Sequence, residues 1–137
     1  MIFLDTNIVS ETLKKAPAEA VVAWLTRHDA ELALSTVVIG ELAYGIAKIR
    51  DDERAPRLAR GLAAWRERFA GRIFAFGEEA ALVYGEIMGE AIRKGAMMTA
   101  PDGMIAAIAK AHGGRLATRN TADYRTCGLD LVNPFDF

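Results

Sequence analysis

Five polar side chains occupy related places along the chain, either shortly after a predicted strand or in the first two turns of a predicted helix. They are, in chain order, Asp5, Glu41, Asp102, Asn120 and Asp123. In a parallel sheet, the carboxyl ends of the strands and the first turns of the following helices share one edge, where ligand sites are built. We therefore expect these side chains to converge on one pocket.

Carboxylates gathered in one pocket favour a bound cation, because without it they repel and raise one another's pKa. A small set of hard oxygen ligands suits Mg²⁺ or Mn²⁺. Such a metal lowers the pKa of a bound water and stabilises charge that develops at phosphorus. The pattern therefore predicts metal-assisted hydrolysis of a phosphodiester. His28 and His112 are weaker candidates, since both fall near predicted helix C-termini, where a cation suits the helix dipole.

Each acid also has an ordinary structural interpretation. Asp5 fits a cap of the helix that follows it, and Asp102 fits a favourable interaction with the helix dipole in a first turn. Glu41 fits a solvated helix flank, and Asp123 fits a turn. Any one carboxylate is weak evidence, so the hypothesis of a common site depends on the shared location at strand ends.

The elements that must position these residues alternate along the chain. Short apolar runs predict strands over residues 2–5, 32–35, 73–76 and 115–118, with an edge strand at 131–132. Apolar periodicity and end signals predict helices over residues 7–14, 17–28, 36–49, 56–69, 78–94 and 101 to about 113. Thr6 or Asn7 is the expected cap of the first helix. Strands separated by helices predict parallel pairing, hence an α/β fold: a three-layer α/β/α sandwich around a central, mostly parallel sheet.

Length and composition narrow the classes of partner. The chain has 137 residues, of which 52% are hydrophobic, so we expect residues 1–137 to form a single domain with a sizeable core. The formal net charge is −1, so a polyanion must meet a local basic patch. Cys127 is the only cysteine, which excludes an intrachain disulfide and makes the cytoplasm the expected location. Neither a signal peptide nor a bilayer-spanning segment is visible, so we expect no membrane partner.

Four segments resemble, in their order and spacing, the PIN-domain ribonucleases, specifically the VapC/FitB-type toxins of bacterial toxin–antitoxin pairs. The segments are Ile2-Phe3-Leu4-Asp5-Thr6-Asn7, Ser35-Thr36-Val37-Val38-Ile39-Gly40-Glu41-Leu42, Asp102-Gly103-Met104-Ile105-Ala106-Ala107-Ile108-Ala109 and Leu116-Ala117-Thr118-Arg119-Asn120-Thr121-Ala122-Asp123-Tyr124. Each is weak alone, whereas the ordered set is a fairly specific signature that covers nearly the whole chain.

The resemblance implies an endoribonuclease that depends on Mg²⁺ or Mn²⁺. Asp5 and Asp102 match the principal metal-binding acids of the family, and Glu41 matches the third acid, which assists through the water shell of the metal. Asn120 stands where many PIN domains carry a fourth acid, and Asp123 follows as a supporting acid. Because an amide brings no charge, the resemblance leaves one or two metal ions open.

The resemblance also implies protein partners. A small antitoxin is expected, with a DNA-binding N-terminal part and a tail that wraps the toxin and blocks its acidic pocket. Operator DNA is then bound by the complex, through the antitoxin. Toxins of this type usually form homodimers, so a homodimer is expected here.

RNA needs a cationic path through this nearly neutral protein. Arg119, beside Asn120, is the first candidate for a phosphate contact, and Thr6 and Asn7 are the other expected substrate contacts. A second candidate is an arginine-rich region, but acidic residues are interleaved in it, so ordinary surface ion pairing is the stronger interpretation and contact with acidic residues of the antitoxin is another. Its members are Arg50, Arg54, Arg57, Arg60, Arg66, Arg68 and Arg72.

Two other functions stay open at this point. A phosphatase with Asp5 as nucleophile also places an acid after a strand, but that chemistry favours a second acid two residues later, where Asn7 stands. A non-catalytic binding module of the same fold could act in transcriptional regulation with its antitoxin. The presence of Asp5, Glu41 and Asp102 argues against that module.

Overall fold

A five-stranded sheet lies at the centre of the computed structural model, which describes all of residues 1–137. The strand order is β3-β2-β1-β4-β5, and every neighbouring pair is parallel. The strands are β1 (Ile2–Leu4), β2 (Leu32–Ser35), β3 (Ile73–Phe74), β4 (Arg115–Ala117) and β5 (Leu131–Val132). All five predicted strands are confirmed. β3 is shorter than the predicted 73–76, which suits its place at the edge of the sheet opposite β5.

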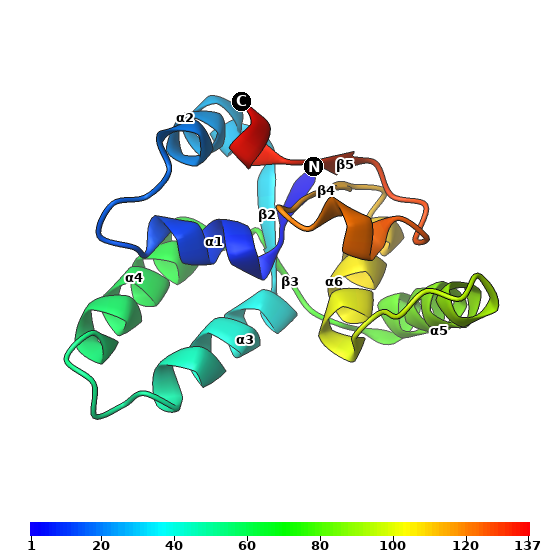
Figure 1. Ribbon diagram of the computed structural model, residues 1–137, viewed down its shortest axis with the longest axis horizontal. Helices are drawn as coiled ribbons and strands as arrows, with labels where there is room; N and C mark the ends of the chain where they lie inside the picture. The colour runs from blue at the N-terminus through cyan, green and yellow to red at the C-terminus, as the bar shows by residue number, and fades with distance from the viewer.

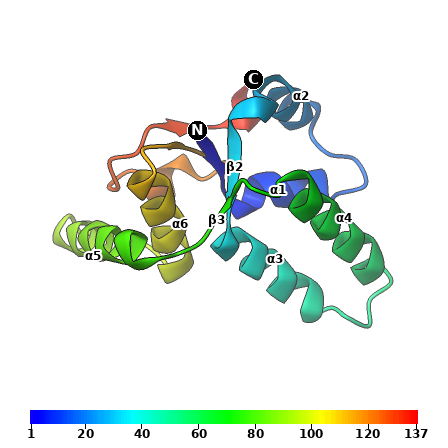
Figure 2. The ribbon, with the colours of Figure 1, turned by 180° about the vertical axis from the view of Figure 1, so that it is seen from behind.

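Helices cover both faces of this sheet. They are α1 (Thr6–Thr12), α2 (Glu19–His28), α3 (Thr36–Ala47), α4 (Ala55–Arg68), α5 (Glu78–Arg93) and α6 (Ala100–Ala111). Figures 1 and 2 show α1, α2 and α4 on one side and the α5–α6 pair on the other, with α3 continuing from the end of β2. The three-layer α/β/α sandwich is thereby confirmed. None of these helices combines the length and apolar character needed to cross a bilayer.

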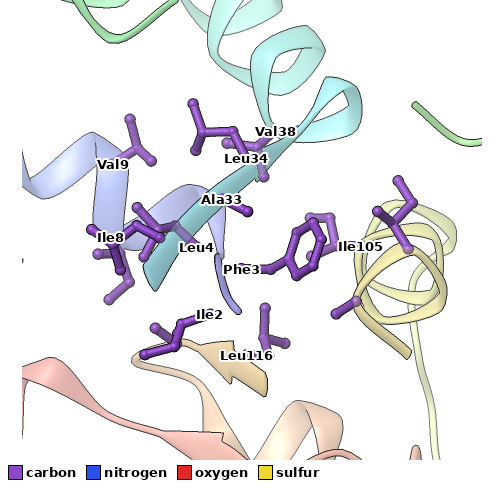
Figure 3. Packing of buried hydrophobic residues seen from close by; sticks show 14 of the residues in the cluster. Ile2, Phe3, Leu4, Ile8, Val9, Ala33, Leu34, Val38, Ile105 and Leu116 are labelled. Atoms are coloured by element: carbon purple, nitrogen blue, oxygen red, sulfur yellow. The ribbon is translucent and has the colours of Figure 1, made fainter. Parts of the chain in front are cut away.

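The central strand β1 is buried on both faces, which explains its uninterrupted apolar sequence. In Figure 3, Phe3 points toward Ile105 of α6, whereas Ile2 and Leu4 lie on the side of Ile8 in α1. These residues belong to one core cluster of 25 buried residues. The core thus fixes β1 between α1 and α6, and the end of β1 is held between the starts of those two helices.

The three helices that begin at the carboxyl edge of the sheet and carry predicted site residues are capped by side chains. The Asp5 carboxylate accepts a bond from the backbone N–H of Thr6 at the start of α1. The Ser35 hydroxyl caps α3, and the Thr99 hydroxyl caps α6. Helices α2, α4 and α5 have no side-chain cap. The prediction of Thr6 or Asn7 as the first cap is wrong, because the helix already includes both residues and Asp5 precedes it.

Candidate functional site

Asp5 lies directly after β1, and its carboxylate is held from three directions. Its Oδ1 accepts the backbone N–H of Thr6 at 2.8 Å. Its Oδ2 accepts the Thr118 hydroxyl at 2.7 Å and the Asn7 amide at 3.2 Å. Only 4% of Asp5 is exposed. The capping role considered for Asp5 is therefore real, but it occupies only one of the two carboxylate oxygens.

Thr118 links the ends of the neighbouring strands β1 and β4. It is fully buried at the end of β4, and its hydroxyl donates its one proton to Asp5. The same oxygen accepts the backbone N–H of Asn120 at 3.0 Å and the Asn7 amide at 3.4 Å. Asn7 in turn accepts the backbone N–H of Arg119 at 3.1 Å. This network fixes the Asp5 carboxylate relative to the segment that carries Asn120.

Glu41 reaches the same edge from the second turn of α3. Its Oε1 accepts the hydroxyl of Thr6 at 2.6 Å, although the two residues are 35 positions apart in the sequence. Because Thr6 is the residue next to Asp5, this bond places Glu41 beside the start of α1. The prediction that Glu41 faces the strand ends, and not only solvent, is supported by this contact.

Asp102 lies in the first turn of α6, where the Thr99 cap holds its backbone N–H at 3.3 Å. Its Oδ1 accepts the hydroxyl of Tyr124 at 3.0 Å. Tyr124 is 1% exposed and belongs to the short helical turn η2 (Thr121–Tyr124) that follows β4. The segment after β4 therefore supplies donors to both Asp5 and Asp102, through Thr118 and Tyr124.

Burial raises the pKa of Asp5 above its ordinary value, and the negative charge of Asp102 raises that pKa further. Hydrogen bonds from Thr118 and Thr6 act against this rise by stabilising the carboxylate. Burial, followed by the charges of Asp5 and Asp102, raises the pKa of Tyr124 well above its usual range, so its hydroxyl keeps its proton. The raised pKa of Asp5 therefore reflects both its burial and the nearby negative charge of Asp102.

The charges of Asp5, Glu41 and Asp102 are not compensated within the chain. None of these carboxylates forms a salt bridge, although seven salt bridges occur elsewhere. At the same time, no three His, Cys, Asp or Glu side chains are gathered as a ready-made metal cage. This donor set fits Mg²⁺, which is commonly held by one or two carboxylates and keeps several of its waters. The assignment of Asp5, Asp102 and Glu41 as metal residues stays a prediction.

Asn120, Asp123 and Arg119 lie on the outer side of these acids. Asn120 is exposed, and only its backbone takes part in hydrogen bonds, to Thr118 and Asp123. Asp123 is exposed, and its carboxylate has no partner. The guanidinium of Arg119 lies 4.3 Å from the ring centre of Phe135, over that ring. The structure thus places these three residues near the site without bonding their side chains to it.

A cavity of about 370 Å³ adjoins Glu41 and Thr6. Three cationic side chains line it, Lys14, Arg54 and Arg57. Lys14 pairs with Glu11 and Arg54 pairs with Asp52, whereas Arg57 donates to the carbonyl oxygen of Leu13 and has no carboxylate partner. The cavity therefore brings part of the arginine-rich region next to Glu41, at the edge of the sheet where Asp5 and Asp102 also lie. The sequence alone does not show this proximity.

Two polar residues of the site, Thr118 and Tyr124, were not among the predicted ones. A threonine directly after an apolar strand, like the aspartate after β1, is the signal that could have identified Thr118. Tyr124 has a weaker signal, a large ring within an otherwise polar turn, which indicates burial but not the partner of its hydroxyl. Both act through Asp5 and Asp102, which the sequence had already singled out.

Comparisons with known proteins agree with this geometry. The PIN domain family model matches residues 2–129. The chain is 37% identical over 138 residues to the VapC ribonuclease Y4jK of Sinorhizobium fredii, covering 99% of each chain. It is 38% identical over 137 residues to toxin FitB of Neisseria gonorrhoeae, covering 98% of this chain and 99% of that one. The crystal structure of FitAcB from Neisseria gonorrhoeae matches with a TM-score of 0.91 and 37% identity, over 100% of both chains.

Proposed function

We propose that this chain, which belongs to the PIN-domain family and within it to the VapC/FitB-type toxins of toxin–antitoxin pairs, is a Mg²⁺- or Mn²⁺-dependent endoribonuclease. One observation supports this most strongly: Asp5, Glu41 and Asp102 reach one edge of the sheet with no cationic partner. Negative charge that the protein leaves uncompensated is favourable only when a cation from solution neutralises it.

In the proposed reaction, Asp5 and Asp102 would hold the cation, and Glu41 would assist through its water shell. When bound, the metal supplies a water of lowered pKa and positive charge beside the phosphate. Thr6 holds Oε1 of Glu41, which leaves Oε2 to orient the attacking water and accept its proton. The oxygen of that water would form a bond to phosphorus while the bond to the leaving ribose oxygen breaks on the opposite side, and the leaving oxygen would take up a proton from solvent water.

The RNA strand is proposed to approach along the cavity beside Glu41. Phosphates are bound mainly by Lys and Arg, and Arg57 has donors free after its bond to the Leu13 carbonyl. Arg119, Asn7 and Asn120 are proposed to contact the strand on the other side of the acids. The exposed amide of Asn120 suits a contact with water or substrate better than a contact with a second cation.

Protein partners follow from membership of the family. We propose a cognate small antitoxin whose tail covers the acidic edge of the sheet, and operator binding by the complex through that antitoxin. The structural likeness to FitAcB over the full chain supports such a partner. A homodimer of this chain belongs to the same proposal.

An aspartate-nucleophile phosphatase is the less favoured alternative. The amide of Asn7, which stands where that chemistry prefers a second acid, donates to Asp5 at 3.2 Å. Trapping a phosphorylated Asp5 would revive this alternative. A non-catalytic binding module is distinguished by binding Mn²⁺ without cutting any RNA.

Cleavage of RNA by the purified protein tests the proposed function. We expect cleavage with Mn²⁺, none with EDTA, and none by Asp5→Asn, which keeps the shape of the side chain but loses its charge. Asp51→Asn is the matched control, because Asp51 is exposed in the turn between α3 and α4 and has no ion pair. Equal cleavage by wild type and Asp5→Asn would refute the assignment.

A further inference from the structure

The two acids at the candidate cation site are held differently. Asp5 accepts three hydrogen bonds, from the Thr6 backbone and from the side chains of Thr118 and Asn7. Asp102 accepts one, from the hydroxyl of Tyr124. The orientation of the Asp102 carboxylate therefore depends on a single donor, whereas that of Asp5 does not.

Tyr124 is itself firmly placed. Its side chain is 1% exposed and belongs to the main core cluster. Its carbonyl oxygen accepts the backbone N–H of Cys127 at 3.2 Å and the Cys127 thiol at 2.8 Å. Strand β4 and the buried Thr118 that directly follows it fix the other end of the same segment. The hydroxyl of Tyr124 consequently has little freedom to move away from Asp102.

The hydroxyl of Tyr124 leaves one oxygen of Asp102 free. It bonds Oδ1 of Asp102 at 3.0 Å. A proton held at this position selects Oδ1 for the hydrogen bond and leaves Oδ2 of Asp102 for another partner.

We propose that Tyr124 is a positioning residue for the cation site, whose hydroxyl orients Asp102 so that Oδ2 faces the metal. This inference rests on the proposed use of Asp5 and Asp102 as metal residues. Hydrogen bonds from the surrounding protein to metal-binding carboxylates commonly set the metal affinity, and their loss costs about 10- to 100-fold. Phenylalanine at this position would fill the same space and lack the donor.

Mn²⁺ affinity measured by calorimetry, without RNA, tests the inference. We expect Tyr124→Phe to bind Mn²⁺ at least about tenfold more weakly than wild type. Tyr84→Phe is the matched control: Tyr84 also packs beside α6, next to Gly103, and no hydrogen bond of its hydroxyl is present. Its affinity should equal that of wild type. Thr118→Val should lose less affinity than Tyr124→Phe, because Asp5 keeps two other donors.

Two further measurements distinguish a specific effect on the orientation of the Asp102 carboxylate from a general loss of structure in Tyr124→Phe. The rise in melting temperature caused by Mn²⁺ compares each variant with its own metal-free state, and we expect a smaller rise for Tyr124→Phe. In RNA cleavage, the Tyr124→Phe defect should shrink as Mn²⁺ approaches saturation. Mn²⁺ affinity of Tyr124→Phe equal to that of wild type would overturn the inference. Absence of RNA cleavage by the wild-type protein would instead refute the proposed function. The two failures can be distinguished, because the comparison of Mn²⁺ affinities is made without RNA.

Discussion

The inner and outer sides of the candidate site are built differently. On the inner side, Asp5, Glu41 and Asp102 each accept a hydrogen bond from a hydroxyl group, from Thr118, Thr6 and Tyr124 respectively. On the outer side, the side chains of Asn120 and Asp123 are exposed and have no hydrogen-bond partner in the chain. Fixed geometry is needed where charge develops in a reaction, whereas groups that contact a changing partner can stay adaptable. This difference suggests that the inner side performs the chemistry and the outer side meets RNA or antitoxin.

The largest effect is expected on the inner side, from Asp102→Asn. An amide oxygen still accepts the Tyr124 hydroxyl, so the fold should be kept, but half of the charge proposed to hold the cation is lost. We expect RNA cleavage to fall to background and Mn²⁺ binding to weaken strongly, as measured by a cleavage assay and calorimetry on the same preparation. Cleavage close to the wild-type rate would show that Asp102 has only its favourable interaction with the dipole of α6.

The next largest effect is expected from Glu41→Gln. Glutamine can keep the bond from Thr6 but cannot accept a proton from water, so kcat should fall by about 10²- to 10⁴-fold. Mn²⁺ affinity should change much less than in Asp102→Asn. If saturating Mn²⁺ restored kcat, Glu41 would be a direct metal ligand and its proposed role in orienting water would be wrong.

A smaller effect, on stability, is expected from the raised pKa of Asp5. Between its ordinary value of 3.8 and the raised value, the folded protein binds more protons at Asp5 than the unfolded chain does. The free energy of unfolding should therefore fall as pH rises through this interval, and Asp5→Asn should lack that fall. Urea denaturation of both proteins in EDTA, at a series of pH values, measures the difference. A difference that does not change with pH would contradict the raised pKa.

The smallest effect is expected on the outer side, from Asp123→Asn. Its carboxylate is exposed and unpaired, so melting temperature and cleavage should stay close to wild type. Asn120→Ala should reduce cleavage more, since it removes the exposed amide that is proposed to contact water or substrate and leaves the backbone bond to Thr118 in place. A loss in Asp123→Asn as large as that of Glu41→Gln would move Asp123 to the catalytic side and remove the contrast between the two sides.

Much of the arrangement was predictable from local sequence. The apolar runs before Asp5 and Thr118 set the strand ends, and capping residues such as Ser35 and Thr99 set the starts of α3 and α6. Glycine marked the end of α5 and α6, where Gly95 and Gly113 adopt φ of 71° and 65°. These signals depend only on residues that are close together in the sequence. For that reason the predicted strands and helices are confirmed, with small shifts of their ends.

The contacts that depend on tertiary packing were not predictable. The bond between Thr6 and Glu41 joins two helices that are distant in the sequence, and the Tyr124 hydroxyl finds Asp102 across 22 positions. The guanidinium of Arg119 lies over Phe135 near the C-terminus, which its position beside Asn120 did not indicate. The types of residue at the site were therefore predicted, while the donors that orient them became visible only in the folded chain.

A crystal structure of the protein grown with Mn²⁺, with anomalous diffraction data, tests the central claim most directly. We predict an ordered Mn²⁺ in contact with the carboxylates of Asp5 and Asp102, and Glu41 reaching it through a water. An ordered Mn²⁺ only at other carboxylates, in protein that cleaves RNA, would contradict the assignment of this edge of the sheet as the catalytic site.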